Sequence, residues 1–229
     1  MFPKCEWFTP DLTMVLHDYG TCILFAHGTG SIREALGSVS WPVHLQVQAD
    51  ALEEVKRYAT VTSEKQMWRM ATDGTDKATE GTDQTGATEG TDYTDLPKRL
   101  AVQDLDSLKR LYGDGASTGE SPDFFYDSMV TDGVFFGVYE GDELVAAAGT
   151  HLVSREEGVA AIGNVYTRRD RRCRGLSRIV TAAVLHELRD VTTIGLNVRG
   201  DNAAAIRVYE SLGFVKHCDF TEAVAVRAL

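Results

Sequence analysis

Five arginines stand within residues 168–174, directly before Gly175, in a chain whose formal net charge is −11. The segment YTRRDRRCRGLS follows a strand-like run and precedes a stretch with helical spacing of apolar residues. The first turn of a helix leaves backbone N–H groups without partners and carries partial positive charge, so it attracts phosphate. We interpret the segment as a diphosphate site, where Arg172 and Arg174 add charge and the small residues Gly175 and Ser177 allow close approach.

Other motifs for phosphate or metal chemistry are missing. The sequence contains neither G-x-x-x-x-G-K-[ST] nor G-x-G-x-x-G. Its four cysteines are widely spaced without a C-x-x-C pair, and its histidines show no ligand spacing. We therefore expect reduced thiols and no bound metal.

The pattern downstream of residue 97 predicts a mixed α/β sheet, in which an antiparallel meander is followed by alternating strands and helices. A helix over 105–112 is expected first. The predicted strands are 134–139, 144–153, 159–167, 193–198 and 220–226, and the later helices span 176–188 and 202–212.

Two segments of this region resemble one known superfamily. NVYTRRDRRCRGLS resembles motif A of the GNAT acyl-CoA N-acyltransferases, whose loop [RQ]-x-x-G-x-[GA] holds the pyrophosphate of acetyl-CoA. DNAAAIRVYESLGF resembles their motif B, N-x-x-A-x-x-x-Y-x-x-x-G-F. The match in motif A falls on Arg172 and Gly175, with Ser177 where Gly or Ala is usual. The two motifs at this separation are specific, and the resemblance covers about Pro97 to Leu229.

The resemblance implies the GNAT fold and transfer of an acetyl group from acetyl-CoA to a primary amine. It implies a strand at Val165 and Thr167 that splays from its neighbour and pairs with the pantetheine arm. Tyr209 matches the usual acid for the leaving thiolate, with core packing as the alternative. Asn202 contacts the cofactor, caps its helix, or does both. The implied cofactor-binding residues are Val165, Tyr166, Thr167, Arg172, Cys173, Arg174, Gly175, Leu176, Ser177, Asn202 and Tyr209.

Cys173 occupies a slot that is often Gly in relatives of this kind. If the backbone there needs a positive φ, a cysteine costs about 1 kcal/mol relative to glycine.

The general base is left open by the sequence. No Glu lies in 159–167, where some superfamily members place one, and His151 has a suitable intrinsic pKa. Regular pairing across the turn 154–158 would set His151 opposite Ala161, on the order of 10 Å from the pantetheine end. Direct proton removal over that distance would need a water chain. The loop GDGASTGESP either lines the acceptor site or is a solvated turn.

Composition divides the chain into three expected segments. These are a small α/β region over 1–71, an acidic Thr/Gly-rich disordered linker over 72–96, and a GNAT N-acetyltransferase domain over 97–229. The first segment is loosely similar to the N-terminal half of glycine N-acyltransferase-like proteins. Its predicted elements are strands over 21–26 and 43–48, a strand at 66–70, and a helix begun by a capping-box-like Asp50 and Glu53, with Leu52, Val55 and Ala59 on one face.

The acidic balance disfavours nucleic acid and anionic membranes as partners. The start MFPKCEWFTPDL lacks the build of a secretory signal, so the expected location is the cytoplasm. We expect a small-molecule or peptide amine as acceptor, and the sequence leaves open whether the protein forms a homodimer. Two alternatives are an acyl-CoA-binding sensor with weak catalysis and an N-acyltransferase of glycine-acyltransferase type that uses other acyl-CoAs.

Overall fold

The computed structural model describes residues 4–9, 11–18, 21–72, 97–122 and 124–228. The predicted linker 72–96 lies outside these ranges except for Thr72. The chain divides into two compact units. The first comprises Met1–Arg69, Val198–Asn202 and His217–Leu229, and the second comprises Met70–Asn197 and Ala203–Lys216.

The second unit is built on a mixed sheet with the strand order β10-β9-β8-β7-β6. Neighbouring strands from β6 to β9 pair antiparallel, whereas β9 and β10 run parallel. This is the mixed α/β architecture predicted from the sequence. The strands are β6 (Lys98–Arg99), β7 (Phe135–Glu140), β8 (Glu143–Ser154), β9 (Val159–Thr167) and β10 (Thr193–Arg199).

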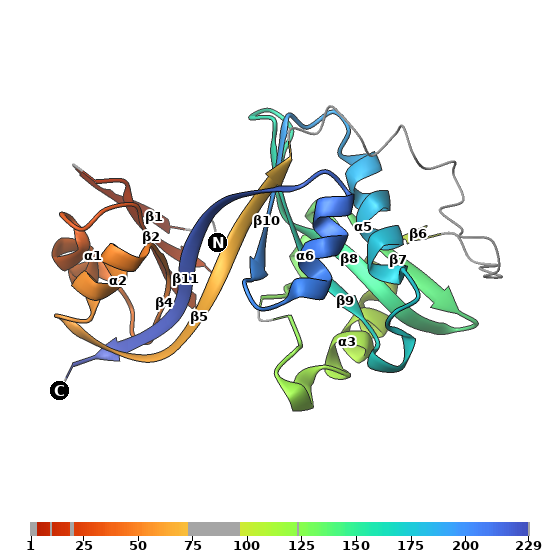
Figure 1. Cartoon of the computed structure of the whole chain (residues 1–229), viewed down its shortest axis with the longest axis horizontal. Helices are drawn as coiled ribbons and strands as arrows, with labels where there is room; N and C mark the ends of the chain where they lie inside the picture. Colours follow the sequence, from red (N-terminus) through yellow and green to blue (C-terminus); the bar gives the residue numbers. More distant parts are fainter. Residues whose placement is uncertain (1–3, 10, 19–20, 73–96, 123, 229) are drawn as a thin grey trace. The chain divides into compact units, whose positions relative to one another are not determined.

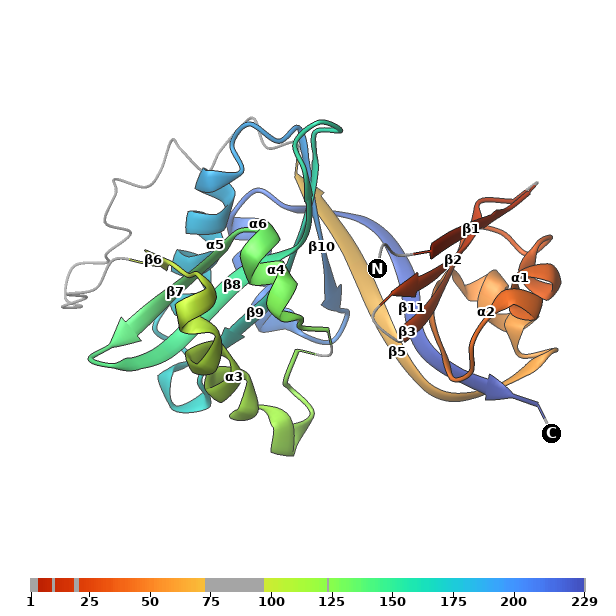
Figure 2. The same ribbon diagram turned by 180° about the vertical axis from the view of Figure 1, so that it is seen from behind.

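Helices cover both faces of this sheet. Figure 1 shows α5 (Leu176–Glu187) and α6 (Ala203–Ser211) in front of the strands, and Figure 2 shows α3 (Leu105–Gly113) and α4 (Asp127–Asp132) on the opposite side. The face under α3 and α4 buries one cluster of apolar and aromatic side chains, which includes Leu108, Tyr112, Phe135 and Tyr166. Among the described residues, no helix combines the length and apolarity needed to cross a membrane.

Pairing between β9 and β10 covers only part of β9. Its register runs from Thr193 opposite Val159 to Leu196 opposite Ile162 and ends there. Among the described strands, the later part of β9 therefore pairs with β8 alone, as expected for a strand that splays from its neighbour.

Two register shifts interrupt the pairing of β8 with β9. Ala147 lies opposite Tyr166 and Gly149 opposite Gly163, so two residues of β9, Asn164 and Val165, face one residue of β8. Asn164 has a φ of 53°, which fits a bulge at this point. The second shift lies in β8, where His151 is the extra residue between the pairs of Thr150 and Leu152.

The first unit has its own core, and its strands belong to the same 11-stranded sheet, with the order β1-β2-β3-β4-β11-β5 ahead of β10. Strands β1 (Lys4–Phe8), β2 (Thr13–Asp18) and β3 (Thr21–Ala26) are antiparallel, and β4 (Val43–Val47) runs parallel to β3. The C-terminal strand β11 (Val215–Arg227) pairs antiparallel with β4, and its Ala223 and Ala225 belong to the core of this unit. The last residues thus group with the N-terminal segment, although they follow the GNAT-like motifs in sequence.

Three details differ from the predicted elements of the first unit. Strands β1 and β2 were not predicted. Helix α2 (Ala49–Val55), which follows α1 (Ile32–Ser38), ends before Ala59, because Ala59 begins the long strand β5 (Ala59–Thr72). The β-branched residues that follow Ala59 favour an extended chain. The expected capping box is wrong, because Gln48 is the N-cap residue of α2 and its side chain makes no capping hydrogen bond to the described residues, while Asp50 Oδ1 accepts the backbone N–H of Ala51 at 2.8 Å.

Candidate active site

The arginine-rich loop connects β9 to α5 through a single turn of 3-10 helix, η3 (Arg169–Arg171). Gly175 is the N-cap residue of α5, with a φ of 74° in the left-handed region that suits glycine. Among the described residues, none accepts a hydrogen bond from the backbone N–H groups of Cys173, Gly175, Leu176 or Ser177. Since α5 carries partial positive charge at this end, these donors form a place for an anion.

Cys173 has a φ of 63° and an exposed thiol. The backbone at this position therefore adopts the left-handed region, which a residue with a side chain disfavours. The expected cost of about 1 kcal/mol relative to glycine applies here.

Every arginine side chain of the loop is engaged by a carboxylate of the same chain. Arg172 makes a two-pronged contact with Glu120, in which Nη1 lies 3.1 Å from Oε1 and Nη2 lies 3.1 Å from Oε2. The complete set is Arg168 with Glu143 and Asp170, Arg169 with Asp114, Arg171 with Glu140 and Asp170, Arg172 with Glu120, and Arg174 with Glu140.

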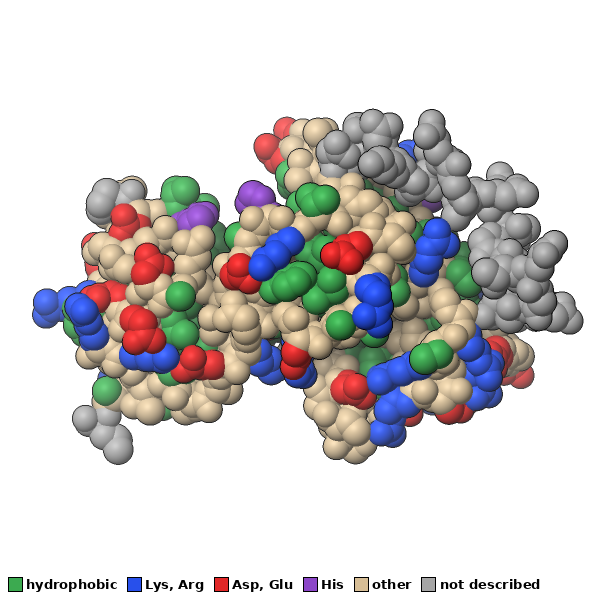
Figure 3. Space-filling view, in the orientation of Figure 1, with side chains coloured by type: hydrophobic (Ala, Val, Ile, Leu, Met, Phe, Trp, Pro, Cys, Tyr) green, Lys and Arg blue, Asp and Glu red, His purple; other side chains and the backbone are tan. Residues whose placement is uncertain are grey.

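These acids were not foreseen from the sequence, because they come from separate turns. Asp114 and Glu120 lie between α3 and α4, and Glu140 and Glu143 flank the β7–β8 turn. In Figure 3 basic side chains gather around the loop after β9, with acidic side chains beside them. A ligand anion would therefore meet neutralised side chains and unpaired backbone donors.

Asp114 fastens the loop to the end of α3. Its Oδ2 accepts the backbone N–H of Arg169 at 3.1 Å and the hydroxyl of Tyr166 at 2.9 Å. The backbone hydrogen bond from Arg169 is the main reason that the pKa of Asp114 lies below its usual value; desolvation opposes this shift and the Tyr166 hydroxyl reinforces it. The side chain of Tyr166 packs in the core and donates its hydroxyl to Asp114, so only the backbone groups of Tyr166 are left to contact a ligand along β9.

Thr167 and Val165 lie in the stretch of β9 that has no β10 partner. The hydroxyl of Thr167 is buried and has no hydrogen-bond partner among the described residues. A buried polar group without a partner is costly unless a ligand satisfies it. The free edge of β9 thus offers backbone and side-chain groups that suit an extended polar chain such as a pantetheine arm.

Tyr209 lies on α6 and is almost fully buried, with its ring 6.0 Å from that of Phe214. Burial raises the pKa of Tyr209 to about 12, so its hydroxyl is protonated at neutral pH. None of the described residues hydrogen-bonds this hydroxyl. Asn202 directly precedes α6 and is exposed, and its backbone N–H donates to the carbonyl of Arg199 at 3.0 Å.

His151 lies closer to the free edge of β9 than regular pairing predicted. The expected position opposite Ala161 is wrong, because the bulge in β8 gives Leu152 that place. The ring instead lies on Gly163, where a Cβ in place of the glycine hydrogen would come within 2.1 Å of Nε2. Only glycine leaves room for the imidazole at this point.

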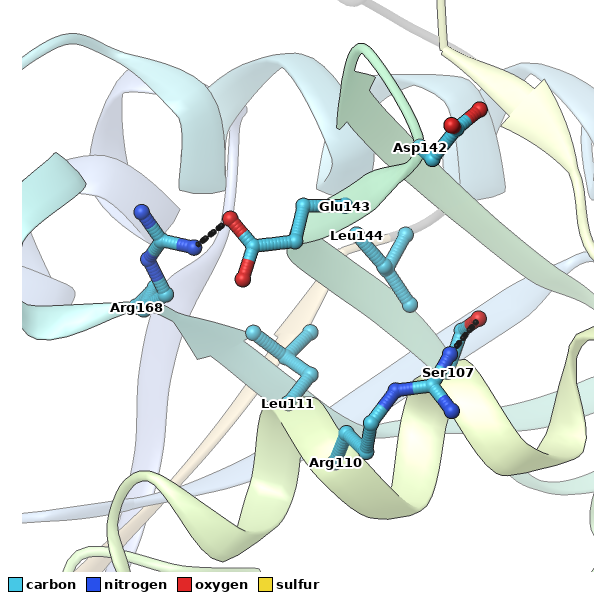
Figure 4. Close-up of a pocket in the computed structure, with 7 residues that line it drawn as sticks. All are labelled: Ser107, Arg110, Leu111, Asp142, Glu143, Leu144 and Arg168. Carbon is cyan, nitrogen blue, oxygen red and sulfur yellow. Dashed lines mark hydrogen bonds and ion pairs between the residues drawn. The ribbon is translucent and has the colours of Figure 1, made fainter.

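A separate pocket lies next to Arg168. It is lined by Ser107, Arg110, Leu111, Asp142, Glu143, Leu144 and Arg168 (Figure 4). Polar side chains that line this pocket pair with each other: Arg168 forms an ion pair with Glu143, and Arg110 donates a hydrogen bond to the hydroxyl of Ser107 at 3.0 Å. None of the residues predicted for the site lines this pocket. The described His, Cys, Asp and Glu side chains form no group of three or more that could hold a metal ion.

Solved structures share this fold. A putative GNAT-family acetyltransferase from Novosphingobium aromaticivorans superposes with a TM-score of 0.63 at 19% identity, over 90% of this chain and 84% of its own. A GCN5-related N-acetyltransferase from Kribbella flavida gives a TM-score of 0.63 at 18% identity, over 98% and 90%.

Curated relatives match in sequence over shorter stretches. A mycothiol acetyltransferase from Rhodococcus opacus is 38% identical over 101 residues, which are 41% of this chain and 33% of that protein. A [ribosomal protein bS18]-alanine N-acetyltransferase from Salmonella typhimurium is 43% identical over 75 residues, which are 32% and 49%. The chain thus spans a third to a half of the length of these relatives. Residues 103–214 match the family model described as Acetyltransferase (GNAT) family, and this part of the chain belongs to that family.

Proposed function

We propose that this protein is an N-acetyltransferase that moves the acetyl group of acetyl-CoA to a primary amine by direct attack. The proposal rests on one observation: two sets of backbone groups without hydrogen-bond partners among the described residues lie next to each other along the chain. One is the row of free N–H groups at the start of α5, and the other is the edge of β9 beyond Ile162. A ligand whose anionic group binds at the start of α5 can extend its chain along the free edge of β9.

Acetyl-CoA supplies an activated thioester, and the protein's residues bind and orient it. The amides from Cys173 to Ser177 and the arginines around them would hold the diphosphate, with Arg172 released from Glu120. Val165 and Thr167 would pair with the pantetheine arm. Tyr209, protonated at neutral pH and without a protein partner, would donate its hydroxyl proton or a hydrogen bond toward the leaving sulfur.

The acceptor is proposed to be a small-molecule or peptide amine. The two relatives above act on chemically different acceptors according to their names, so the shared region supports the acetyl transfer and not one particular amine. Thiol release from acetyl-CoA with an alanine-initiated peptide, spermidine, kanamycin and free amino acids would define the acceptor class. Tight acetyl-CoA binding with no turnover on any of them would favour the sensor alternative.

The binding step is tested by thermal unfolding with acetyl-CoA. Saturating acetyl-CoA raises the melting temperature of the wild type, since a ligand that binds the folded state stabilises it. Arg172→Glu abolishes this rise by placing a negative charge at the diphosphate. The matched control is Arg33→Glu, an equal charge reversal on α1, which keeps the rise. A wild-type melting temperature that does not respond to acetyl-CoA would overturn the proposal.

A further inference from the structure

We propose that His151 is the general base that removes the proton of the acceptor amine, and that Asn164 positions it. This inference rests on the proposed acetyl transfer and adds the group that the transfer lacks. It is carried by the two bulges of β8 and β9, which bring these residues together at the first residue of β9 without a β10 partner.

The direction of the bound chain follows from where its diphosphate lies. The amides at the start of α5 come after the end of β9, so an arm that leaves them and follows the free edge runs from Thr167 back toward Gly163. Its acyl end therefore lies at the part of β9 on which the His151 ring is packed. Val165 is two residues from Gly163, which is about 7 Å along a strand. That distance is shorter than the one expected from regular pairing.

The environment of Asn164 suits it to accept a hydrogen bond from a protonated imidazole. It is 5% exposed, its Nδ2 donates to the sulfur of Met129 at 3.5 Å, and its backbone carbonyl accepts the Tyr112 hydroxyl at 2.9 Å. Its Oδ1 is buried without a hydrogen-bond partner among the described residues. A buried acceptor beside an imidazole becomes satisfied when the ring gains a second N–H on protonation. The left-handed backbone at Asn164 suits Asn better than most residues.

The ring is neutral, and thus able to accept a proton, at physiological pH. Desolvation by the surrounding protein lowers the pKa of His151 even though the side chain keeps an exposed surface, and the side chain of Asn164 acts in the opposite direction. No charged group contributes to this shift. The titratable residues on the elements packed against β8 are Asp106, Lys109, Arg110 and Tyr112 on α3, Asp127 and Asp132 on α4, Tyr139 and Glu140 on β7, Tyr166 on β9, and Arg178, His186 and Glu187 on α5.

The proton balance of the step is simple. His151 takes one proton from the amine nitrogen as that nitrogen bonds to the thioester carbon. The C–S bond breaks, its electron pair leaves with the sulfur, and the sulfur gains a proton to become the thiol. The proton on the sulfur comes from the Tyr209 hydroxyl. His151 releases its proton to solvent, and Tyr209 regains one from solvent, so that an amide and a thiol are the products and both side chains return to their starting state.

Two variants test the proposal in kinetics, with the amine from the panel above that the wild type uses best. His151→Gln lowers kcat on the order of 10²-fold with little change in melting temperature. The matched control His186→Gln, on α5, keeps wild-type kcat. Asn164→Asp sets a carboxylate beside the ring, which favours the protonated imidazole, so the acidic limb of the kcat/KM profile moves to higher pH. An unchanged kcat in His151→Gln, or an unmoved limb in Asn164→Asp, overturns the inference.

A spectroscopic arm decides the matter if no amine in the panel is turned over. The ring resonances of His151, assigned by their loss in His151→Gln, should shift when acetyl-CoA binds, whereas those of His186 should not. If acetyl-CoA raises the melting temperature but leaves His151 unshifted, this inference fails and the proposed cofactor site stands. If acetyl-CoA does not bind at all, the proposed function fails.

Discussion

Arg172 and Glu120 form a two-pronged ion pair across 52 positions of sequence, with both N–O distances at 3.1 Å. Glu120 also accepts the hydroxyl of Thr118 at 3.0 Å, and the hydrogen bonds from Arg172 are the main reason that its pKa is lowered. The carboxylate of Glu120 thus occupies the donors that a phosphate of the proposed ligand would use. If Arg172 binds the diphosphate of the proposed ligand, its guanidinium must leave Glu120.

Replacing Glu120 by Gln should therefore strengthen binding of acetyl-CoA. Both side chains are about 40% exposed, so the pair contributes no more than about 1 kcal/mol, and the expected gain in affinity is about 2- to 5-fold. Isothermal titration with acetyl-CoA measures it. Glu157→Gln, which removes an equal charge from the β8–β9 turn, serves as the control and should leave the affinity unchanged. Weaker binding in Glu120→Gln would show that Glu120 orients Arg172 for the ligand.

The positive φ of Cys173 predicts a difference between two substitutions at one site. Cys173→Gly should be more stable than Cys173→Ala by about 1 kcal/mol, because glycine adopts this backbone without steric cost. For a chain of this size that corresponds to roughly 2–4 °C in melting temperature. Equal melting temperatures for the two variants would mean that the loop relaxes to a negative φ in solution.

The Tyr209→Phe variant should distinguish a catalytic role of the Tyr209 hydroxyl from a packing role of its ring. The hydroxyl has no hydrogen-bond partner among the described residues, so its removal should change the melting temperature by little. If this hydroxyl serves the leaving sulfur, kcat should fall on the order of 10²-fold while acetyl-CoA still binds. Tyr58→Phe, on the surface of the first unit, is the control for loss of a phenol. An unchanged kcat would leave Tyr209 as a core residue alone.

The contacts of Asp114 predict a pH-dependent contribution to stability. Its pKa is lowered in the folded protein, so the carboxylate stabilises the fold above its unfolded pKa of about 3.9, and this contribution is lost as the pH falls through the folded-state pKa. The wild type should therefore have a higher melting temperature than Asp114→Asn at neutral pH, and the two melting temperatures should converge under strongly acidic conditions. Thermal unfolding between pH 7 and pH 2.5 measures this, and a constant difference over the range would contradict it.

The sequence by itself determined most elements of the second unit, though not β6 and α4, and it determined the place of the arginine-rich loop that we propose binds the diphosphate. Strand alternation, helical spacing and the glycine before α5 are local features, so β9, α5, β10 and α6 lie within one or two residues of their predicted bounds. The end of β9–β10 pairing at Ile162 agrees with the splayed strand that the resemblance implied. The cost of a side chain at Cys173 followed from the sequence only as a condition, since it depends on the sign of φ at that residue.

The tertiary structure decided what depends on pairing between distant segments. Register shifts depend on how two strands pair. The sequence pattern alone therefore places His151 opposite Ala161, whereas the folded strands place its ring on Gly163. The partner of Arg172 comes from a turn 52 residues away, where Glu120 looks like any solvated acid. Strand β11 pairs with β4 because its apolar side chains complete the core of the first unit, and that complementarity exists only once both strands are folded.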